Sequence, residues 1–234
     1  MANSYFQFKQ FTVWQGQCAM KVGTDGVLLG AWTPVETARR ILDVGTGTGL
    51  VALMLAQRSR AAVVALEIDP DAALQASENA ARSPWKERIK VLQTDFRHYH
   101  SEQLFDVIVS NPPYFIASLP CPDGQRTAAR HNGGLTYSEL LQGVSALLTP
   151  EGFFTLIIPA DVAERVIETA RGSLLYPLRQ LSVLTKPGGP PKRTLITFSF
   201  RKQECQSEEL LTEIARHQYS EAYKALTKEY YLKM

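Results

Sequence analysis

Short apolar runs alternate with longer segments of helical periodicity between residues 40 and 200. The apolar runs have the length of buried strands and cover residues 39–44, 61–68, 88–93, 105–110 and 152–158. The segments between them that repeat apolar positions at helical spacing are 50–58, 70–82 and 137–148. Strands that alternate with helices in this way predict an α/β fold, in which a parallel sheet carries helices on both faces.

Local signals sharpen this prediction. Pro70 occupies the favoured first turn of its helix, and Thr136 with Glu139 forms a capping box ahead of another. Two late strands, at 178–185 and 193–200, are joined by the loop KPGGPPK and not by a helix. Such a connection predicts an antiparallel pair at the edge of the sheet. We therefore expect a seven-stranded, mostly parallel sheet with an antiparallel edge strand.

Both ends of the chain differ from this core. Residues 5–14 alternate apolar and polar positions and predict a small hairpin, and residues 21–32 predict a tight turn that leads into a short helix. After residue 201 a polar stretch leads to an amphipathic helix with Ser220 as its cap. No repeat or linker divides the chain, so we expect one domain over 1–234. It comprises an N-terminal segment (1–35), a core (36–201) and a C-terminal extension (202–234).

Composition and charge limit the kinds of protein this is. The net charge of +2 and the pI of about 8.4 are too small to indicate nucleic-acid binding, for which a pI above about 9 is typical. The apolar run at 153–158 is far shorter than the roughly 20 residues that span a bilayer. The N-terminus has no signal-peptide pattern, and Cys18, Cys121 and Cys205 lack metal-ligand spacing. These features predict a cytoplasmic protein without a membrane segment or a metal site.

A glycine-rich turn joins the first strand to the first helix. The sequence DVGTGTG at 43–49 places Gly45, Gly47 and Gly49 where the chain turns sharply and leaves its backbone bare to a ligand. The dinucleotide-binding fingerprint requires a glycine at its sixth position, and Leu50 stands there. The turn therefore predicts a nucleotide-like ligand at the carboxyl ends of the strands, but of another kind.

Acidic residues end the next two strands. Glu67 is placed to bind a ribose diol through both carboxylate oxygens, and Asp95 is placed to accept a hydrogen bond from an adenine amino group. Taken singly, Glu67 and Asp69 are equally well explained as strand-end and helix-capping acids. Combined with the glycine turn, the acids at successive strand ends indicate a cofactor site.

The fourth strand ends in Asn-Pro-Pro-Tyr at 111–114. A two-proline corner fixes the Asn111 side-chain oxygen and the Pro112 carbonyl, and both can accept hydrogen bonds from a planar NH2 group. Tyr114 can stack on a base, which contributes roughly 1–3 kcal/mol. The corner predicts methylation of an exocyclic amine, with Asn111, Pro112 and Tyr114 as catalytic residues and Pro113 as a further substrate contact. An isolated motif of this kind can also be a simple turn capped by asparagine.

From about residue 20 to residue 200 these motifs resemble the S-adenosylmethionine-dependent methyltransferases of class I, which have a Rossmann-like fold. The resemblance implies that Gly45, Gly47 and Gly49 pass near the methionine part of the cofactor and that Asp43 orients the turn. It implies that Glu67 holds the ribose and that Asp95 meets the adenine ring. Asn111 also belongs to this cofactor site.

A closer resemblance covers nearly the whole chain. It is carried by CAMKVGTDGVLLGAW (18–32), ALEIDPDA (65–72), SPWKERI (83–89), SNPPY (110–114) and YSEAYKALT (219–227). Together these segments resemble the bacterial valine-tRNA adenine-37 N6-methyltransferase family. That family implies a tRNA substrate, and it implies that Lys21, Thr24 and Asp25 close over S-adenosylmethionine. Thr24 and Asp25 suit a helix N-cap equally well.

Basic residues near the predicted target base are candidates for RNA binding. Arg126, Arg130 and His131 follow the proline corner and can pair with phosphates. A solvated polar loop explains them as well. Further cations flank the KPGGPPK loop or lie on the last helix, namely Lys186, Lys192, Arg193, Lys224, Lys228 and Lys233. For the lysines of the last helix a solvated helix face is the simpler explanation.

Other functions use the same corner chemistry. A release-factor glutamine methyltransferase usually carries an extra N-terminal helical domain, whereas this chain reaches its glycine turn by residue 45. An rRNA guanine-N2 enzyme usually carries a second domain that 234 residues cannot hold. Methylation of a release-factor glutamine, methylation of rRNA at guanine N2 or adenine N6, and a non-catalytic methyltransferase-like subunit are the alternatives. We expect a monomer that acts on tRNA.

Overall fold

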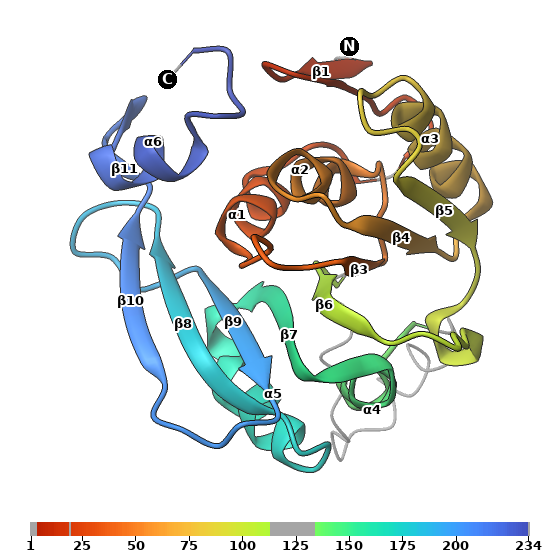
Figure 1. The fold of residues 1–234 in the computed structure, drawn as a ribbon. Coiled ribbons are helices and arrows are strands. Elements are labelled where there is room, and N and C mark those ends of the chain that lie inside the picture. The colour runs from red at the N-terminus through yellow and green to blue at the C-terminus, as the bar shows by residue number, and fades with distance from the viewer. Residues whose placement is uncertain (1–3, 19, 113–133, 234) are drawn as a thin grey trace, which may run out of the picture.

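Eight strands form the central sheet: β3 (Arg40–Val44), β4 (Ala62–Glu67), β5 (Ile89–Gln93), β6 (Phe105–Ser110), β7 (Leu148–Pro159), β8 (Tyr176–Leu184), β9 (Arg193–Ser199) and β10 (Gln206–Leu211). Their order across the sheet is β10-β8-β9-β7-β6-β3-β4-β5 (Figure 1). The protein is seen in a computed structural model that describes residues 4–18, 20–112 and 134–233.

The sheet is mostly parallel, as the sequence predicts. β3 pairs in parallel with β4 and β6, and β6 pairs in parallel with β7. β9 runs antiparallel to both β7 and β8, which confirms the predicted antiparallel pair. The sheet has one strand more than predicted, because β10 adds in parallel beyond β8. Only Leu210 of β10 is buried, so the strand lacks the alternation of apolar and polar residues by which a strand is predicted from sequence.

Helices cover both faces of the sheet. Their bounds are α1 (Thr24–Trp32), α2 (Leu50–Arg58), α3 (Pro70–Ala81), α4 (Tyr137–Leu147), α5 (Ala163–Arg171) and α6 (Glu221–Thr227), with short 3-10 turns η1 (Phe96–His98) and η4 (Ala160–Val162). α1 and α2 share one core with Ile41 of β3, while α4 and α5 share the other with Leu42. Successive residues of one strand thus face opposite layers, which gives the three-layer arrangement. Within the described ranges, no helix is long and apolar enough to cross a membrane.

Side-chain caps define three of the helix starts. The capping box of Thr136 and Glu139 is present at α4, Asp69 caps α3 ahead of Pro70, and Ser220 caps α6. α5 lies outside the sequence prediction. It begins after Val162, whose side chain makes no cap, so its start carries no polar signal.

The two ends of the chain meet on one side of the molecule (Figure 1). β1 (Tyr5–Gln7) and β2 (Thr12–Trp14) form the predicted N-terminal hairpin. Phe8 forms a β-bridge with Tyr231, and the Lys9 amide donates to the Tyr230 carbonyl at 2.8 Å. A second hairpin, β11 (Glu213–Ala215) with β12 (Gln218–Tyr219), connects β10 to α6.

Candidate active site

A cavity of about 610 Å³ opens at the carboxyl ends of β3, β4, β5 and β6. Small-molecule sites typically enclose about 300–1,000 Å³, and in parallel sheets they lie at this edge. The structure brings nearly all the predicted cofactor residues to its wall: Lys21, Thr24, Asp25, Asp43, Gly45, Gly47, Glu67, Asp95 and Asn111. Gly49 does not line the cavity. It begins α2 as the N-cap residue, with φ of 82°.

The glycine turn needs glycine for backbone conformation and not for space. Gly45 and Gly47 have φ of 74° and 56°, a backbone region that residues other than glycine rarely adopt. A Cβ atom at either position would meet no atom within 4 Å. The Gly45 and Thr46 amides both donate to the Leu66 carbonyl at 2.9 Å, which fixes the turn to β4. The open side of the turn therefore leaves bare backbone at the cavity.

Asp43 holds the turn from below. Its side chain is 1% exposed and accepts a hydrogen bond from the Thr46 hydroxyl, with 2.6 Å between Oγ1 and Oδ2. Burial, with a smaller contribution from the negative charge of Glu67, raises the pKa of Asp43 to about 7. The carboxyl group is thus a structural anchor of the turn with an acid–base equilibrium near neutral pH.

Asp43 is expected to make folding stability depend on pH. Its pKa of about 7 in the folded protein compares with about 3.9 in an unfolded chain. Below pH 4 the carboxyl is protonated in both the folded and the unfolded state, so it adds no dependence of stability on pH. Between pH 4 and 7 the unfolded state gives up the proton more readily, so stability falls as pH rises. Denaturant unfolding should show wild type losing on the order of 4 kcal/mol relative to Asp43→Asn across this window. Parallel pH profiles for the two proteins would contradict the assignment.

Glu67 joins the end of β4 to the glycine turn. Its Oε2 accepts from the Gly47 amide at 2.8 Å, and its Oε1 accepts from the amides of Ile68 and Asp69 at 2.9 and 3.1 Å. A carboxylate has about four acceptor positions, so one remains, at Oε2. A ribose diol can use that position directly. Binding through both oxygens, as the sequence predicts, requires Oε1 to release one amide.

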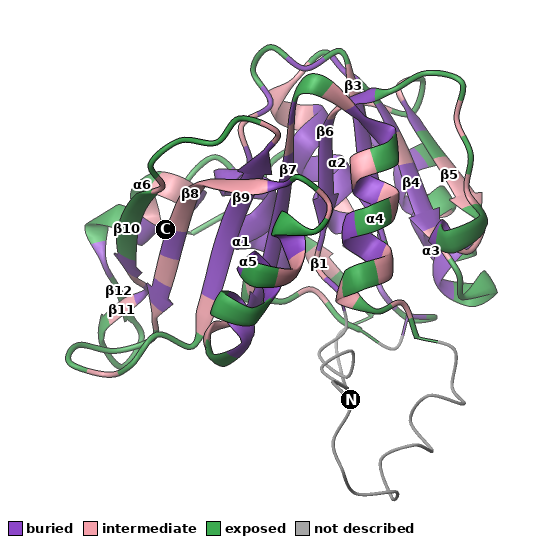
Figure 2. Cartoon of the chain, turned by 90° about the horizontal axis from the view of Figure 1, so that it is seen from below, coloured by how far each residue is buried: buried purple, intermediate pink, exposed green. Residues whose placement is uncertain are grey.

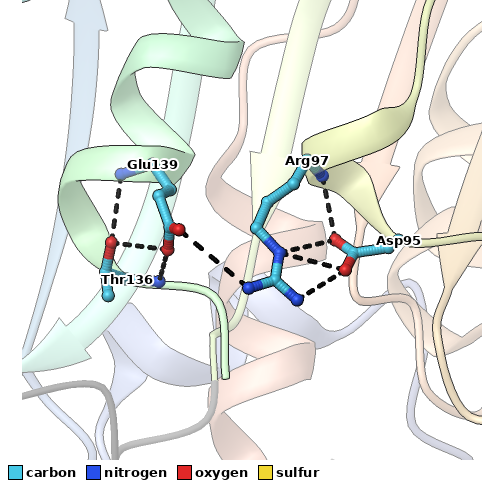
Figure 3. Close-up of polar contacts among 4 residues, drawn as sticks. All are labelled: Asp95, Arg97, Thr136 and Glu139. Carbon is cyan, nitrogen blue, oxygen red and sulfur yellow. Dashed lines mark hydrogen bonds and ion pairs between the residues drawn. The ribbon is translucent and has the colours of Figure 1, made fainter. Parts of the chain in front are cut away.

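Asp95 lies in a charged network at the end of β5 (Figure 3). Arg97 holds both of its oxygens: Nη2 lies 2.5 Å from Oδ2, and Nε lies 3.0 Å from each oxygen. The Arg97 amide also donates to Oδ1 at 2.9 Å. These hydrogen bonds hold the pKa of Asp95 below its ordinary value. Asp95 therefore faces the cavity as a carboxylate whose orientation is set by Arg97.

The same arginine connects the cavity wall to the start of α4. Its Nη1 lies 4.0 Å from Oε1 of Glu139, in the first turn of α4 (Figure 3). Glu139 is fixed in turn by the Thr136 amide and hydroxyl, at 2.8 and 2.7 Å, and these bonds lower its pKa. Sequence analysis missed Arg97. Its only local signal is its position two residues after a strand-end aspartate.

Asn111 presents an unpaired acceptor at the end of β6. Its Oδ1 is buried and has no hydrogen-bond partner among the described residues. Such a group costs roughly 1–3 kcal/mol unless a ligand satisfies it. The Ser110 hydroxyl anchors the strand end to the Val44 carbonyl at 2.9 Å, and Pro112 completes this wall of the cavity. The other predicted substrate residues lie outside the described residues: Pro113, Tyr114, Arg126, Arg130 and His131.

The segment before α1 borders the cavity but differs from the sequence prediction. The Lys21 ammonium donates to the carbonyls of Gln15 and Cys18, at 2.5 and 2.8 Å, and so fixes its own segment. The helix cap predicted at Thr24 and Asp25 is wrong. Gly23 is the N-cap residue and makes no side-chain bond, because α1 already starts at Thr24.

Asp25 makes a long-range contact instead. Its Oδ2 lies 2.8 Å from Nε of Arg193, the first residue of β9.

Asn79 is another residue that was not predicted from the sequence. It is 1% exposed, and its Nδ2 donates to the Thr48 and Trp14 carbonyls at 2.8 and 2.7 Å. A buried amide on the alanine-rich face of α3 is the signal for it. The two contacts tie β9 and the N-terminal hairpin to the walls of the cavity.

Comparison with known proteins adds independent information. The Methyltransferase small domain family matches residues 19–120. A protein of Bacteroides thetaiotaomicron is 68% identical over 234 residues, covering 99% of each chain, and one of Phocaeicola vulgatus is 54% identical over all of each chain. A protein of Aeromonas hydrophila is 45% identical over 99% of each chain. All three carry the name tRNA1(Val) (adenine(37)-N6)-methyltransferase.

Solved structures share the fold. A predicted O-methyltransferase of Agrobacterium tumefaciens superposes with a TM-score of 0.68 at 21% identity, over 88% of this chain and 96% of the other. A glycopeptide N-methyltransferase complexed with S-adenosylmethionine superposes with a TM-score of 0.56 at 15% identity, over 77% of this chain and 100% of the other. At these identities the likeness shows the fold, which is that of the class I methyltransferases.

Proposed function

The chain belongs to the tRNA1(Val) (adenine(37)-N6)-methyltransferase family, and from this premise we propose that it methylates the N6 atom of adenine 37 in a valine tRNA. The methyl donor in this proposal is S-adenosylmethionine. One observation supports the proposal most directly. The buried Oδ1 of Asn111 lacks a partner in the described structure and lines the same cavity as the glycine turn, Glu67 and Asp95.

The cavity residues fit this cofactor. The bare backbone at Gly45 and Gly47 leaves room for the methionine part, and Glu67 retains an acceptor position for the ribose. Asp95 lines the same wall, and accepting from the adenine amine requires Arg97 to release one of its four hydrogen bonds to that carboxylate. When bound, S-adenosylmethionine supplies an electrophilic methyl group on a sulfonium. Asp25, which is paired with Arg193, and Glu67 are acidic residues of the cavity wall.

The corner at the end of β6 prepares the acceptor nitrogen. The lone pair of an exocyclic amine is delocalised into the ring, so the nitrogen is a weak nucleophile. Hydrogen bonds from its two N–H groups to the Asn111 Oδ1 and the Pro112 carbonyl favour a tetrahedral nitrogen with a directed lone pair. The rate then depends on positioning and on exclusion of water, and the proton leaves after the nitrogen has gained the methyl group. In this proposal Tyr114 stacks on the flipped base.

Two further points belong to the proposal. We propose a cytoplasmic location, because the proposed substrate is a tRNA. The described part of the chain contains no group of three or more side chains arranged to hold a metal ion, and the proposed chemistry uses none. We propose that the protein acts as a monomer.

Methyl transfer to isolated RNA tests this function. Labelled S-adenosylmethionine is incubated with total tRNA that lacks the modification, and the nucleosides are then separated. We expect N6-methyladenosine confined to a valine tRNA. A transcript with guanine at position 37 is the matched control and should stay unlabelled. Label in rRNA or in a release factor would redirect the corner chemistry to another substrate. No label in any acceptor would favour a non-catalytic subunit.

A further inference from the structure

Two exposed segments lie at the same edge of the sheet as the cavity. β8 runs parallel to the strands whose carboxyl ends form the cavity, so the β8–β9 loop (185–192) leaves the sheet at that edge. β10 is parallel to β8, so the β11–β12 hairpin (213–219) leaves there as well. Figure 2 shows this hairpin as mostly exposed, at the lower ends of β8 and β10. Neither segment takes part in the cavity described above.

The loop and the hairpin are joined to each other. The Thr212 amide donates to the Leu184 carbonyl at 2.8 Å, and its hydroxyl lies 3.4 Å from the Thr185 carbonyl. The Ser220 amide in turn donates to the Thr212 carbonyl at 2.9 Å. Backbone bonds at both ends of the hairpin therefore fix it against the start of the loop. The two segments form one continuous surface, which we call the loop–hairpin surface (185–192 and 213–219).

This surface carries cations without acidic partners. Lys186, Lys192 and Arg216 are exposed, and none of them forms an ion pair with another described residue. Arg58, by contrast, is paired with Glu36. Glu213, the acid of the hairpin, is half-buried at its base. Exposed, uncompensated cations in one patch attract a polyanion.

Apolar side chains accompany these charges. On the same hairpin Ile214 is 54% exposed and Tyr219 is 38% exposed. The Tyr219 ring is supported from behind by Tyr223, with 5.1 Å between the ring centroids. Surfaces that bind RNA combine cations, which contact the phosphates, with exposed aromatic rings, which stack on bases. A loop that is only solvated does not require exposed aromatic rings.

The surface is connected to the cavity by a fixed contact. Arg193 follows Lys192 directly and pairs with Asp25, a residue of the cavity wall, at 2.8 Å. Three strand spacings separate β8 from β6, which carries Asn111 at its end. At about 4.8 Å per spacing the surface begins roughly 14 Å from the proline corner. One RNA that places a base at Asn111 can therefore contact this surface with its backbone.

We propose that the loop–hairpin surface is a second contact site for tRNA, which binds phosphates through Lys186, Lys192 and Arg216. This inference rests on the proposed function, and it locates recognition outside the catalytic corner. It accounts for tRNA binding by a protein of small net charge, because these three cations lie at the edge where the target base enters and have no acidic partner among the described residues. The contacts are to the backbone, so they position the RNA and leave base choice to the cavity.

A charge-neutralised triple variant, Lys186→Gln, Lys192→Gln and Arg216→Gln, tests the site. Each lost phosphate contact lowers the slope of log affinity against log salt by about 0.7–0.9. We expect the slope for tRNA to fall by about 2–3 and the affinity to fall about 50-fold at 0.15 M salt. The KM for tRNA should rise accordingly. Affinity for S-adenosylmethionine without RNA should stay unchanged, which also shows that the variant folds.

The matched control removes three exposed cations at the opposite edge of the sheet: Arg60→Gln, Lys86→Gln and Lys202→Gln. It changes the net charge equally and should keep the wild-type slope. If the triple variant behaves like this control while wild type methylates tRNA, the inference is wrong and the surface belongs to a protein partner. If wild type methylates no tRNA at all, the proposed function fails first, and the inference fails with it.

Discussion

Asn111→Ala is expected to lower kcat for tRNA methylation by about 10²–10³-fold, the loss typical of removing one preorganised hydrogen-bonding group from an active site. The alanine side chain removes the buried Oδ1 that lacks a partner in the described structure. Without this acceptor the target nitrogen keeps its lone pair in the ring, and the second acceptor, the Pro112 carbonyl, cannot orient it alone. Single-turnover kinetics with saturating tRNA and cofactor measure the chemical step directly.

The controls separate chemistry from binding. Affinity for S-adenosylmethionine is expected to change little, because the Gly45 and Gly47 backbone, Glu67 and Asp95 stay in place. Asn111→Asp retains an oxygen acceptor at the same position and should keep more activity than the alanine variant. Wild-type turnover by Asn111→Ala would contradict the assignment of the corner. A large loss of cofactor affinity with unchanged kcat would make Asn111 a cofactor residue only.

The parts of the site that were predictable are those whose signal is local. Gly45 and Gly47 stand in a glycine pattern, Glu67 and Asp95 each end an apolar run, and Asn111 precedes two prolines. In a parallel sheet the ends of such runs meet at one edge, so their assembly follows from fold class. Because each of these residues follows a strand of the parallel sheet, the sequence alone was enough to predict that they line one cavity.

The contacts that were missed join residues far apart in the sequence. Arg97 pairs with its neighbour Asp95, but its second contact, Glu139, is 42 residues away in α4. Arg193 and Asp25 are 168 residues apart. Neither contact follows from a local pattern, because each depends on how two elements pack. An exposed polar run at 206–211 was missed for a related reason, since an edge strand needs no apolar face to pair.

Glu67→Ala is expected to weaken binding of S-adenosylmethionine by at least about 100-fold. Hydrogen bonds to a charged group contribute about 1.5–3 kcal/mol each, so losing two at a ribose diol, the second formed when Oε1 releases one of its backbone amides, corresponds to this factor or more. The change also releases the Gly47 amide, whose 2.8 Å bond to Oε2 holds the glycine turn against β4. Isothermal titration in the absence of RNA measures the affinity. Glu67→Gln keeps the shape but sets an N–H group against backbone donors, so it should fall between wild type and Glu67→Ala.

Asp69→Ala provides the matched control for Glu67. Asp69 lies two residues further on and caps α3 through the Ala72 amide at 2.8 Å, but it does not line the cavity. Its loss should cost about 1 kcal/mol of stability and leave cofactor affinity unchanged, because a helix cap acts on folding and not on the ligand. Glu67→Ala should show the reverse balance, with the larger change in affinity. If both variants bind the cofactor as tightly as wild type, Glu67 is a strand-end acid that only orders the turn, and the ribose is held elsewhere.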